Sequence, residues 1–313
     1  RKEKDKEERR KKKDIRYMIA AELIDKVRRI EIKTRGLSQQ VFAGQYHSAF
    51  KGQGMAFSEV REYQYGDPIR SIDWNVTARF NRPFIKVFDE ERELTVMLLV
   101  DVSGSNEFGT RGRFKRELMT ELAAVLAFSA IQNNDKIGVI LFSDRVEKFI
   151  PPKKGTKHIL RIILELLEFN PIGKGTNIPE AIRFFTHANK KRSTVFVISD
   201  FMLGSAKESV VVADSLRLAS RKHDLVVLQT IDEGELNLPD AGLLKMLDPE
   251  TGETRWIDTS SRKTRHHFNN WWKEIHQQLT TSFKRSGIDY VTLRTSEDYV
   301  TPLMRLFEKR GRR

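Results

Sequence analysis

An apolar run that ends in a cluster of oxygen-bearing side chains constrains the fold of this chain more than any other feature. Residues 94–100 read LTVMLLV, which is apolar but for one threonine and contains no charged residue. Such a run is typical of a strand that is buried on both faces of a parallel sheet. The segment DVSGS follows at 101–105, and ligands bind beyond the carboxyl ends of such strands. The sequence therefore predicts an α/β protein with a polar loop at one sheet edge.

Strand and helix patterns alternate along the rest of the chain. Apolar runs at 137–142, 194–198, 225–230 and 288–293 predict further strands. Residues 145–150 are expected to form a hairpin with the first of these runs, closed by Pro151 and Pro152. Alternating strands and helices predict a doubly wound, mostly parallel sheet with right-handed crossovers. The helices between the strands are expected at 114–129, 158–169, 179–189, 209–220, 262–286 and 297–307.

The amino-terminal part of the chain has a different character. Residues 1–16 contain ten Lys or Arg and five Asp or Glu, which is typical of solvated helix or disorder. Residues 17–32 have helical apolar spacing, whereas Gly and aromatic residues at 41–57 favour short strands with tight turns. A further strand is expected at 84–88. The expected division is 1–16 as a charged tail, 17–93 as a helix plus a small β-rich region, and 94–313 as the α/β domain with an insertion near 232–260.

Composition excludes several classes of protein. The chain has no Cys, so disulfides and thiolate metal sites are ruled out. No stretch approaches the roughly 20 apolar residues that span a bilayer, and no secretory signal is apparent, so a cytoplasmic location is expected. The net charge is +13, but acids interrupt the basic tail and no aromatic residues interleave with it. Nucleic acid is therefore not the expected partner.

Three polar segments converge at the predicted sheet edge. Asp101, Ser103 and Ser105 follow one buried strand, Asp200 follows another, and Thr176 lies in a GKGTN loop before a helix. Their hydroxyl and carboxylate oxygens suit Mg²⁺, and Mn²⁺ accepts the same ligands. With only two carboxylates the ion stays electrophilic and can accept a carboxylate from outside. The alternative is that the serines only cap the next helix.

A second segment, before the apolar run, mixes charged and aromatic side chains. Ion pairs and aromatic packing are expected to hold a surface together here, and a catalytic role or an interface is the alternative. The expected pairs join Arg61, Arg70 and Arg79 to Glu62, Asp67 and Asp73. The residues singled out in this segment are Arg61, Tyr63, Gly66, Asp67, Arg70, Asp73, Trp74 and Arg79.

The polar set at the sheet edge resembles the metal-ion-dependent adhesion site of von Willebrand factor A-type domains, residue by residue. The resemblance implies that the three hydroxyls ligate a metal and that the two Asp residues act directly or through water. It also implies that an acidic residue of a protein partner completes the coordination.

From about Tyr17 the chain is also similar to the bacterial "domain of unknown function fifty-eight" family, whose members commonly accompany MoxR-type AAA+ ATPases. Asn106 stands where that family often has Met, and it is expected to affect packing beside the loop and not metal binding. The closer match is carried by REY at 61–63, GD at 66–67, RSIDW at 70–74, AR at 78–79, NDKIG at 134–138, FSD at 142–144, ISDF at 198–201 and HD at 223–224.

These resemblances imply a Mg²⁺-dependent protein-interaction module, an adaptor or chaperone-like partner of a MoxR-type AAA+ ATPase. Two alternatives come from other classes: a hydrolase that uses the same metal, and a nucleic-acid-binding protein with a basic surface. The sequence has no Walker A, HExxH or GxSxG motif, and it offers no general base beyond the site's own ligands. An enzyme is therefore not expected.

Overall fold

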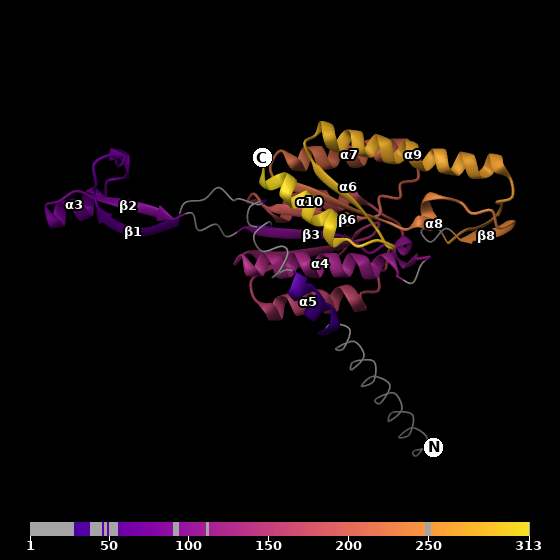
Figure 1. Cartoon of the computed structure of the whole chain (residues 1–313), viewed down its shortest axis with the longest axis horizontal. Coiled ribbons are helices and arrows are strands. Elements are labelled where there is room, and N and C mark those ends of the chain that lie inside the picture. The colour runs from indigo at the N-terminus through magenta and orange to yellow at the C-terminus, as the bar shows by residue number, and fades with distance from the viewer. Residues whose placement is uncertain are drawn as a thin grey trace, which may run out of the picture.

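A six-stranded sheet organises the main part of the chain (Figure 1). The computed structural model describes residues 28–37, 46, 49, 56–89, 94–110, 113–247 and 252–312. The sheet order is β10-β7-β6-β3-β4-β5, which is the doubly wound order with the first and fourth strands of the domain side by side. The predicted fold class is confirmed. The strands are β3 (Thr95–Asp101), β4 (Lys136–Phe142), β5 (Val146–Lys153), β6 (Thr194–Ser199), β7 (Asp224–Ile231) and β10 (Asp289–Arg294).

Strand β3 lies at the centre of this sheet, parallel to β4 on one side and to β6 on the other. After Thr95 every residue of β3 is buried, as its apolar sequence predicts. Side chains alternate between the faces, so Leu98 and Leu99 belong to two different hydrophobic clusters. The end of β3 is thus fixed by neighbours on both sides, and this rigidity positions the loop that follows.

Helices cover both faces of the sheet. One face packs against α4 (Lys115–Gln132), α5 (Thr156–Glu168) and α10 (Val300–Gly311). The other packs against α6 (Ile178–Ala188), α7 (Ala206–Ser220) and α9 (Arg262–Arg285). Figure 1 shows α4 and α5 on the opposite side of the sheet from α7 and α9.

Most expected elements are present with shifted ends, and the shifts have local causes. Helix α7 begins at Ala206 and not at 209, because the Ser205 hydroxyl accepts a hydrogen bond from the Glu208 N–H at 3.3 Å. Strand β5 is antiparallel to β4 as expected, but it continues to Lys153. The prediction that Pro151 and Pro152 close the hairpin is wrong, because an edge strand tolerates proline.

A small β unit precedes the main sheet. Strands β1 (Ala56–Glu62) and β2 (Phe84–Asp89) are antiparallel, and η2 (Ile69–Ser71) and α3 (Trp74–Phe80) lie between them. The strand predicted at 84–88 is therefore present. Asp73 caps α3 by accepting from the N–H groups of Asn75 and Val76. Among the described side chains from 60 to 86, only Ile85 is buried, so this unit has very little core of its own.

The remaining predictions have mixed outcomes. Within the expected insertion, α8 (Glu233–Leu236) precedes a hairpin of β8 (Leu243–Leu247) and β9 (Thr254–Asp258), whose strands were not predicted. Residues 28–37 are helical, so the helix continues beyond the apolar spacing of 17–32 and includes Gly36, which was expected to end it. The charged tail and most of 41–57 lie outside the described residues; Tyr46 and Ala49, expected in short strands, are helical.

In the part of the chain that the structure describes, no helix has the length and apolarity to cross a bilayer.

Candidate metal-binding site

The polar loops lie at the switch point of the sheet, where β3 and β6 run side by side. Asp101 is the last residue of β3, and Asp200 comes directly after β6. The loop after Asp101 forms the short helix η3 (Gly104–Glu107). Because the two strands are parallel neighbours, their carboxyl ends bring these two carboxylates to one edge, as the sequence predicts.

Asp101 is 1% exposed, and hydrogen bonds hold both of its carboxylate oxygens. Oδ1 accepts from the Ser103 N–H at 2.9 Å, and Oδ2 accepts from the Ser199 hydroxyl at 2.7 Å. Ser199 was not among the predicted site residues, although it lies beside Asp200 in the sequence. Its position at the end of β6 could have revealed it, because β6 adjoins β3.

The two loop hydroxyls complete a connected set. Ser103 Oγ lies 3.1 Å from Ser105 Oγ, and the Ser105 hydroxyl is one of the groups that lower the pKa of Asp200. Neighbouring oxygens around an octahedral Mg²⁺, with Mg–O distances of about 2.1 Å, lie about 3.0 Å apart. The two serine oxygens therefore have a spacing that fits adjacent positions on such an ion.

The predicted fifth ligand, Thr176, is half-buried on a neighbouring loop. The Gly104 N–H donates to the Lys174 carbonyl at 3.0 Å, so this loop contacts the serine loop two residues before Thr176. Glu147 holds the loop as well, because its Oε1 accepts from the N–H groups of Ile172 at 3.1 Å and Gly173 at 2.7 Å. Three of the five predicted ligands, Asp101, Ser103 and Ser105, are thus linked by hydrogen bonds. Asp200 follows the neighbouring strand, and the loop of Thr176 adjoins the serine loop.

The donor set fits a hard divalent cation. It consists of two carboxylates and three hydroxyls, which are the oxygen ligands that Mg²⁺ takes. Across the described residues, no group of three or more His, Cys, Asp or Glu is arranged to hold a metal. The described residues therefore contain no cluster of the kind that binds transition metals through His and carboxylates.

Asn106 lies directly against the predicted ligands. Its Nδ2 donates to the Asp101 carbonyl at 3.1 Å and approaches Ser103 Oγ at 3.3 Å, while its Oδ1 is buried without a partner. The expectation that Asn106 affects packing beside the loop and not metal binding stays a prediction, but the contacts of Asn106 reach further than packing. It fixes the positions of two predicted ligand residues, because its amide bridges the end of β3 and the serine loop.

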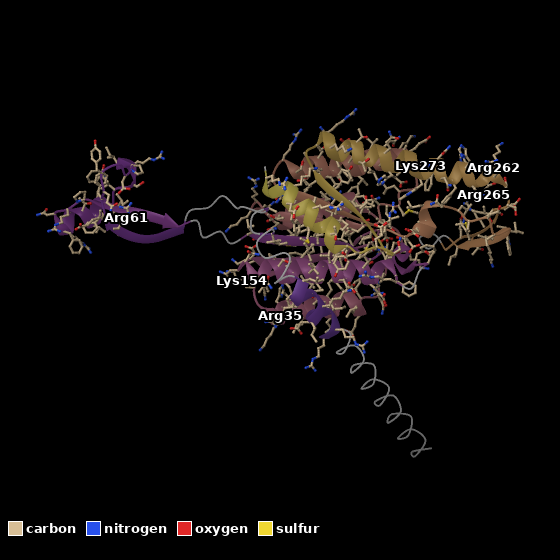
Figure 2. The ribbon with its side chains drawn as sticks, in the orientation of Figure 1. Arg35, Arg61, Lys154, Arg262, Arg265 and Lys273 are labelled. Carbon is tan, nitrogen blue, oxygen red and sulfur yellow. The ribbon has the colours of Figure 1, made fainter. Side chains whose placement is uncertain are left out.

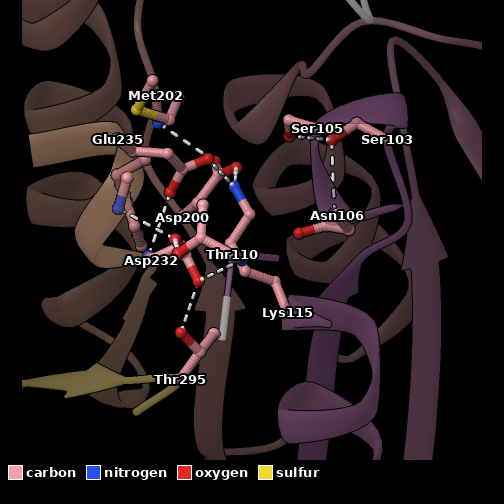
Figure 3. Close-up of polar contacts among 12 residues, drawn as sticks. Ser103, Ser105, Asn106, Thr110, Lys115, Asp200, Met202, Asp232, Glu235 and Thr295 are labelled. Atoms are coloured by element: carbon pink, nitrogen blue, oxygen red, sulfur yellow. Dashed lines mark hydrogen bonds and ion pairs between the residues drawn. The ribbon is translucent and has the colours of Figure 1, made fainter. Parts of the chain in front are cut away.

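A buried lysine, which the sequence analysis missed, joins the site (Figure 3). Lys115 Nζ lies 2.7 Å from Asp200 Oδ2 and also donates to Glu235 Oε1. The lysine side chain is completely buried. One sequence signal could have found it, since Lys115 shares the helical face of Leu118 and Leu122, where a solvent-exposed lysine is not expected.

These neighbours shift the pKa values of the charged groups. Burial, followed by the charge of Asp200, raises the pKa of Asp101 to about 6. Burial also acts to raise the pKa of Asp200, but the Lys115 ammonium outweighs it and the pKa is lowered. Burial acts to lower the pKa of Lys115, but the two carboxylates raise it above its ordinary value. Burial raises the pKa of Glu235 despite its pairing with Lys115.

The polar contacts continue from Glu235 into a buried network. Glu235 Oε2 accepts from the Asp232 N–H at 3.1 Å, and the two residues form the capping box of α8. Asp232 in turn accepts from the hydroxyls of Thr110 at 2.5 Å and Thr295 at 2.6 Å. Figure 3 shows this chain of contacts running from Asp200 to Thr295. The candidate site is therefore tied to α8 and to the end of β10.

The charged and aromatic segment belongs to the small β unit (Figure 2, around Arg61). Arg61 forms a bidentate pair with Asp67, both distances being 2.9 Å. The other two expected arginine pairs are wrong: Asp73 lies 3.4 Å from Lys86, and Glu62 lies 3.2 Å from Arg82. Arg70 and Arg79 are exposed. Trp74 is 66% exposed, so it does not pack as expected, while Tyr63 is half-buried and Gly66 has a φ of 106°.

The fold and the site together define a doubly wound α/β protein with a polar site at its switch point. The chain belongs to the family described as "Protein of unknown function DUF58", which matches residues 59–278. The uncharacterized protein Rv1480 of Mycobacterium tuberculosis (strain ATCC 25618 / H37Rv) is 26% identical over 291 residues, covering 91% of this chain and 89% of the relative. The uncharacterized protein MAV169 of Mycobacterium avium is 23% identical over 164 residues, covering 51% of this chain and 94% of the relative.

Solved structures with partial similarity include two α/β proteins. The conserved hypothetical protein BatB from Bacteroides thetaiotaomicron has a TM-score of 0.46 at 17% identity, covering 70% of this chain and all (100%) of that one. The SpRpn10 VWA domain has a TM-score of 0.37 at 12% identity, covering 68% and 94%.

Proposed function

We propose that this protein is a Mg²⁺-dependent protein-interaction module that captures an acidic residue of a partner. The observation that carries the proposal is the meeting of Asp101, Ser103, Ser105 and Asp200 at the switch point of the sheet, where hydrogen bonds join the first three. Asp101 and the two serines would hold the ion, with Asp200 and Thr176 acting directly or through water. The bound ion supplies an electrophilic position that accepts a carboxylate oxygen.

Residues around these ligands would hold them ready for the ion. Ser199 and the Ser103 N–H orient the Asp101 carboxylate, and Asn106 ties the serine loop to the end of β3. Glu147 fixes the neighbouring loop. General acid–base catalysis needs a group that exchanges protons with a substrate. Donors already engage both carboxylates here, which supports a binding role and not a hydrolytic one.

The proposed partner is a MoxR-type AAA+ ATPase, with this protein acting as its adaptor or chaperone-like companion. This part of the proposal rests on the resemblance of the sequence to a family whose members commonly accompany such ATPases. Capture of a purified MoxR-type ATPase from the same organism by the immobilised full chain should succeed in Mg²⁺ and fail in EDTA. Capture that EDTA leaves unchanged would contradict the metal-bridged contact. Binding of nucleic acid that weakens steeply with salt would favour the basic-surface alternative.

Titration of Mg²⁺ into the full chain, followed by calorimetry, tests the metal site itself. Asp101→Asn should weaken Mg²⁺ binding at least tenfold, because it replaces an anionic ligand by a neutral one of the same shape. Thr176→Val should weaken binding less, since it removes one neutral oxygen. Mn²⁺ should bind the wild type as well.

Asp144→Asn is the matched control for this titration. Asp144 lies beside the same loop but pairs with Arg145 at 2.8 Å, and its side chain is 43% exposed. The affinity of the Asp144→Asn variant for Mg²⁺ should match that of the wild type. Equal affinities of the wild type and Asp101→Asn would remove the proposed site.

A further inference from the structure

The charge of Lys115 is placed where helix electrostatics oppose it. Lys115 is the first residue of α4, and the amino-terminal end of a helix favours anions over cations. Its ammonium is also fully buried, and burial of a charge is expensive without good partners. Asp200 and Glu235 supply those partners at hydrogen-bond distance. Apolar packing alone would be served as well by a Met or Leu at this position, so the ammonium needs another explanation.

The position of the ammonium relative to the candidate ligands suggests that explanation. Asp200 Oδ2 faces Lys115 Nζ at 2.7 Å, and Asp200 Oδ1 accepts from the Met202 N–H at 3.0 Å. Asp101 has no cationic partner among its described contacts, which come from Ser103, Asn106 and Ser199. The Lys115 ammonium therefore neutralises the carboxylate of Asp200, whereas the carboxylate of Asp101 remains available to the metal.

We propose that Lys115 is the resident counter-ion that sets the affinity of this site for its metal and keeps the bound metal in need of an external carboxylate. This inference rests on the proposed function and extends it. The ammonium lowers the negative charge that Asp200 presents, so the ion is held mainly by Asp101 and the hydroxyls. A metal held by less negative charge attracts an incoming carboxylate more strongly. Glu235 limits this effect, because it shares the charge of the same ammonium.

Two substitutions of touching residues should change Mg²⁺ affinity in opposite directions. Lys115→Met removes the competing cation and should tighten Mg²⁺ binding at least tenfold, since like charges no longer repel across the site. Glu235→Gln leaves the ammonium to Asp200 alone and should weaken binding by a similar factor. Calorimetric titration of the full chain with Mg²⁺ measures both. If Lys115 and Glu235 had only a structural role, both variants would bind Mg²⁺ more weakly than the wild type.

Stability measurements keep the test valid if Lys115→Met folds poorly. That variant leaves Asp200 and Glu235 close together without a cation, so its melting temperature in EDTA should fall. Mg²⁺ should then raise its melting temperature by more than it raises that of the wild type. The double variant Lys115→Met/Glu235→Gln relieves the repulsion and should bind Mg²⁺ more tightly than Glu235→Gln alone.

Ser129→Ala is the control for a buried polar change in the same helix. Ser129 donates to the Val125 carbonyl at 2.8 Å and lies near the opposite end of α4 from Lys115, so the Mg²⁺ affinity of this variant should equal that of the wild type. The inference is overturned if removal of Lys115 fails to tighten Mg²⁺ binding in both backgrounds. That result differs from a failure of the proposed function, in which the wild type binds Mg²⁺ no better than Asp101→Asn.

Discussion

The acidic side chains at the sheet edge with the candidate metal site and those of the small β unit have opposite environments. At the edge, Asp101 and Asp200 are buried, at 1% and 0% exposure, and they depend on groups from distant parts of the chain. In the small unit, Asp67 and Glu62 meet arginines that lie within 20 positions of them, at the protein surface. Buried charges that share partners respond as a group, whereas exposed pairs act nearly independently. Changes at the edge should therefore have large, coupled effects, and changes in the small unit small, local ones.

The pH dependence of stability should differ in sign between the two regions. Burial raises the folded-state pKa of Asp101 from 3.8 to about 6, so ionisation costs the folded state more than the unfolded state. In EDTA, the contribution of Asp101 to stability is therefore lost as pH rises from about 4 through 6, by up to about 3 kcal/mol. Denaturant unfolding of the wild type and Asp101→Asn across this range measures it. A difference between the two proteins that does not change with pH would show that Asp101 ionises there without cost.

Asp67 should show the reverse dependence. The hydrogen bonds from Arg61, followed by that from the Gln64 N–H, lower the pKa of Asp67 below 3.8. Its contribution is thus present above pH 4 and lost as pH falls through the folded-state value.

Two glycines allow a second comparison of the regions, with a smaller expected effect. A Cβ at Gly173 would lie 2.1 Å from Asp144 Oδ1 and 2.3 Å from Ser143 Oγ, so Gly173→Ala must displace these side chains or the loop that carries Thr176. We expect a loss of about 1–3 kcal/mol in the free energy of unfolding, together with weaker Mg²⁺ binding. Gly66 has open space around it but a φ of 106°, so Gly66→Ala should cost about 1 kcal/mol of backbone strain.

Mg²⁺ affinity separates the two glycine variants. Gly66→Ala should bind Mg²⁺ like the wild type, because its strain stays within the small unit. If Gly173→Ala also retains full affinity, the loop of Thr176 does not contribute to the site.

The smallest expected effects come from the arginines of the small unit. Asp67→Ala removes the bidentate pair with Arg61 and the acceptor of the Gln64 N–H, so hydrogen exchange of the backbone at 60–86 should speed up. Arg70→Ala should leave exchange unchanged, since Arg70 is exposed and has no ion pair among the described residues. Faster exchange in Arg70→Ala would mean that this side chain stabilises the unit. Loss of partner capture without a change in exchange would identify Arg70 as an interface residue.

The sequence predicted the proximity of Asp101 and Asp200 better than the local ion pairs, and the reason is physical. Asp101 and Asp200 are far apart in the chain, but the rule that parallel strands end at one sheet edge brings them together. In the small unit, by contrast, several carboxylates lie close in the sequence to Arg61, Arg70 and Arg79, and any of them could form the pair. The turns of the small unit decide which pair forms, and composition does not encode those turns.

The missed residues of the site have similar physical causes. Lys115, Glu235 and Asn106 are polar, but their roles depend on which groups face them after folding. Lys115 lies on an apolar helical face, and Glu235 sits in an insertion for which no helix or strand was predicted. Asn106 was noticed as a departure from its family and was then assigned to packing. Donor and acceptor partners cannot be assigned before the backbone path of η3 is known.

The prolines of β5 have a consequence for how this molecule behaves in a crowded solution. Any open sheet exposes a row of unpaired N–H and C=O groups at its edge, which another chain can join. Pro151 and Pro152 have no N–H groups, and the register of β5 against β4 shifts beside them. The edge is therefore interrupted in the middle of its pairing pattern. A strand from a second molecule finds no continuous ladder there, so this side of the sheet is protected against growth into aggregates.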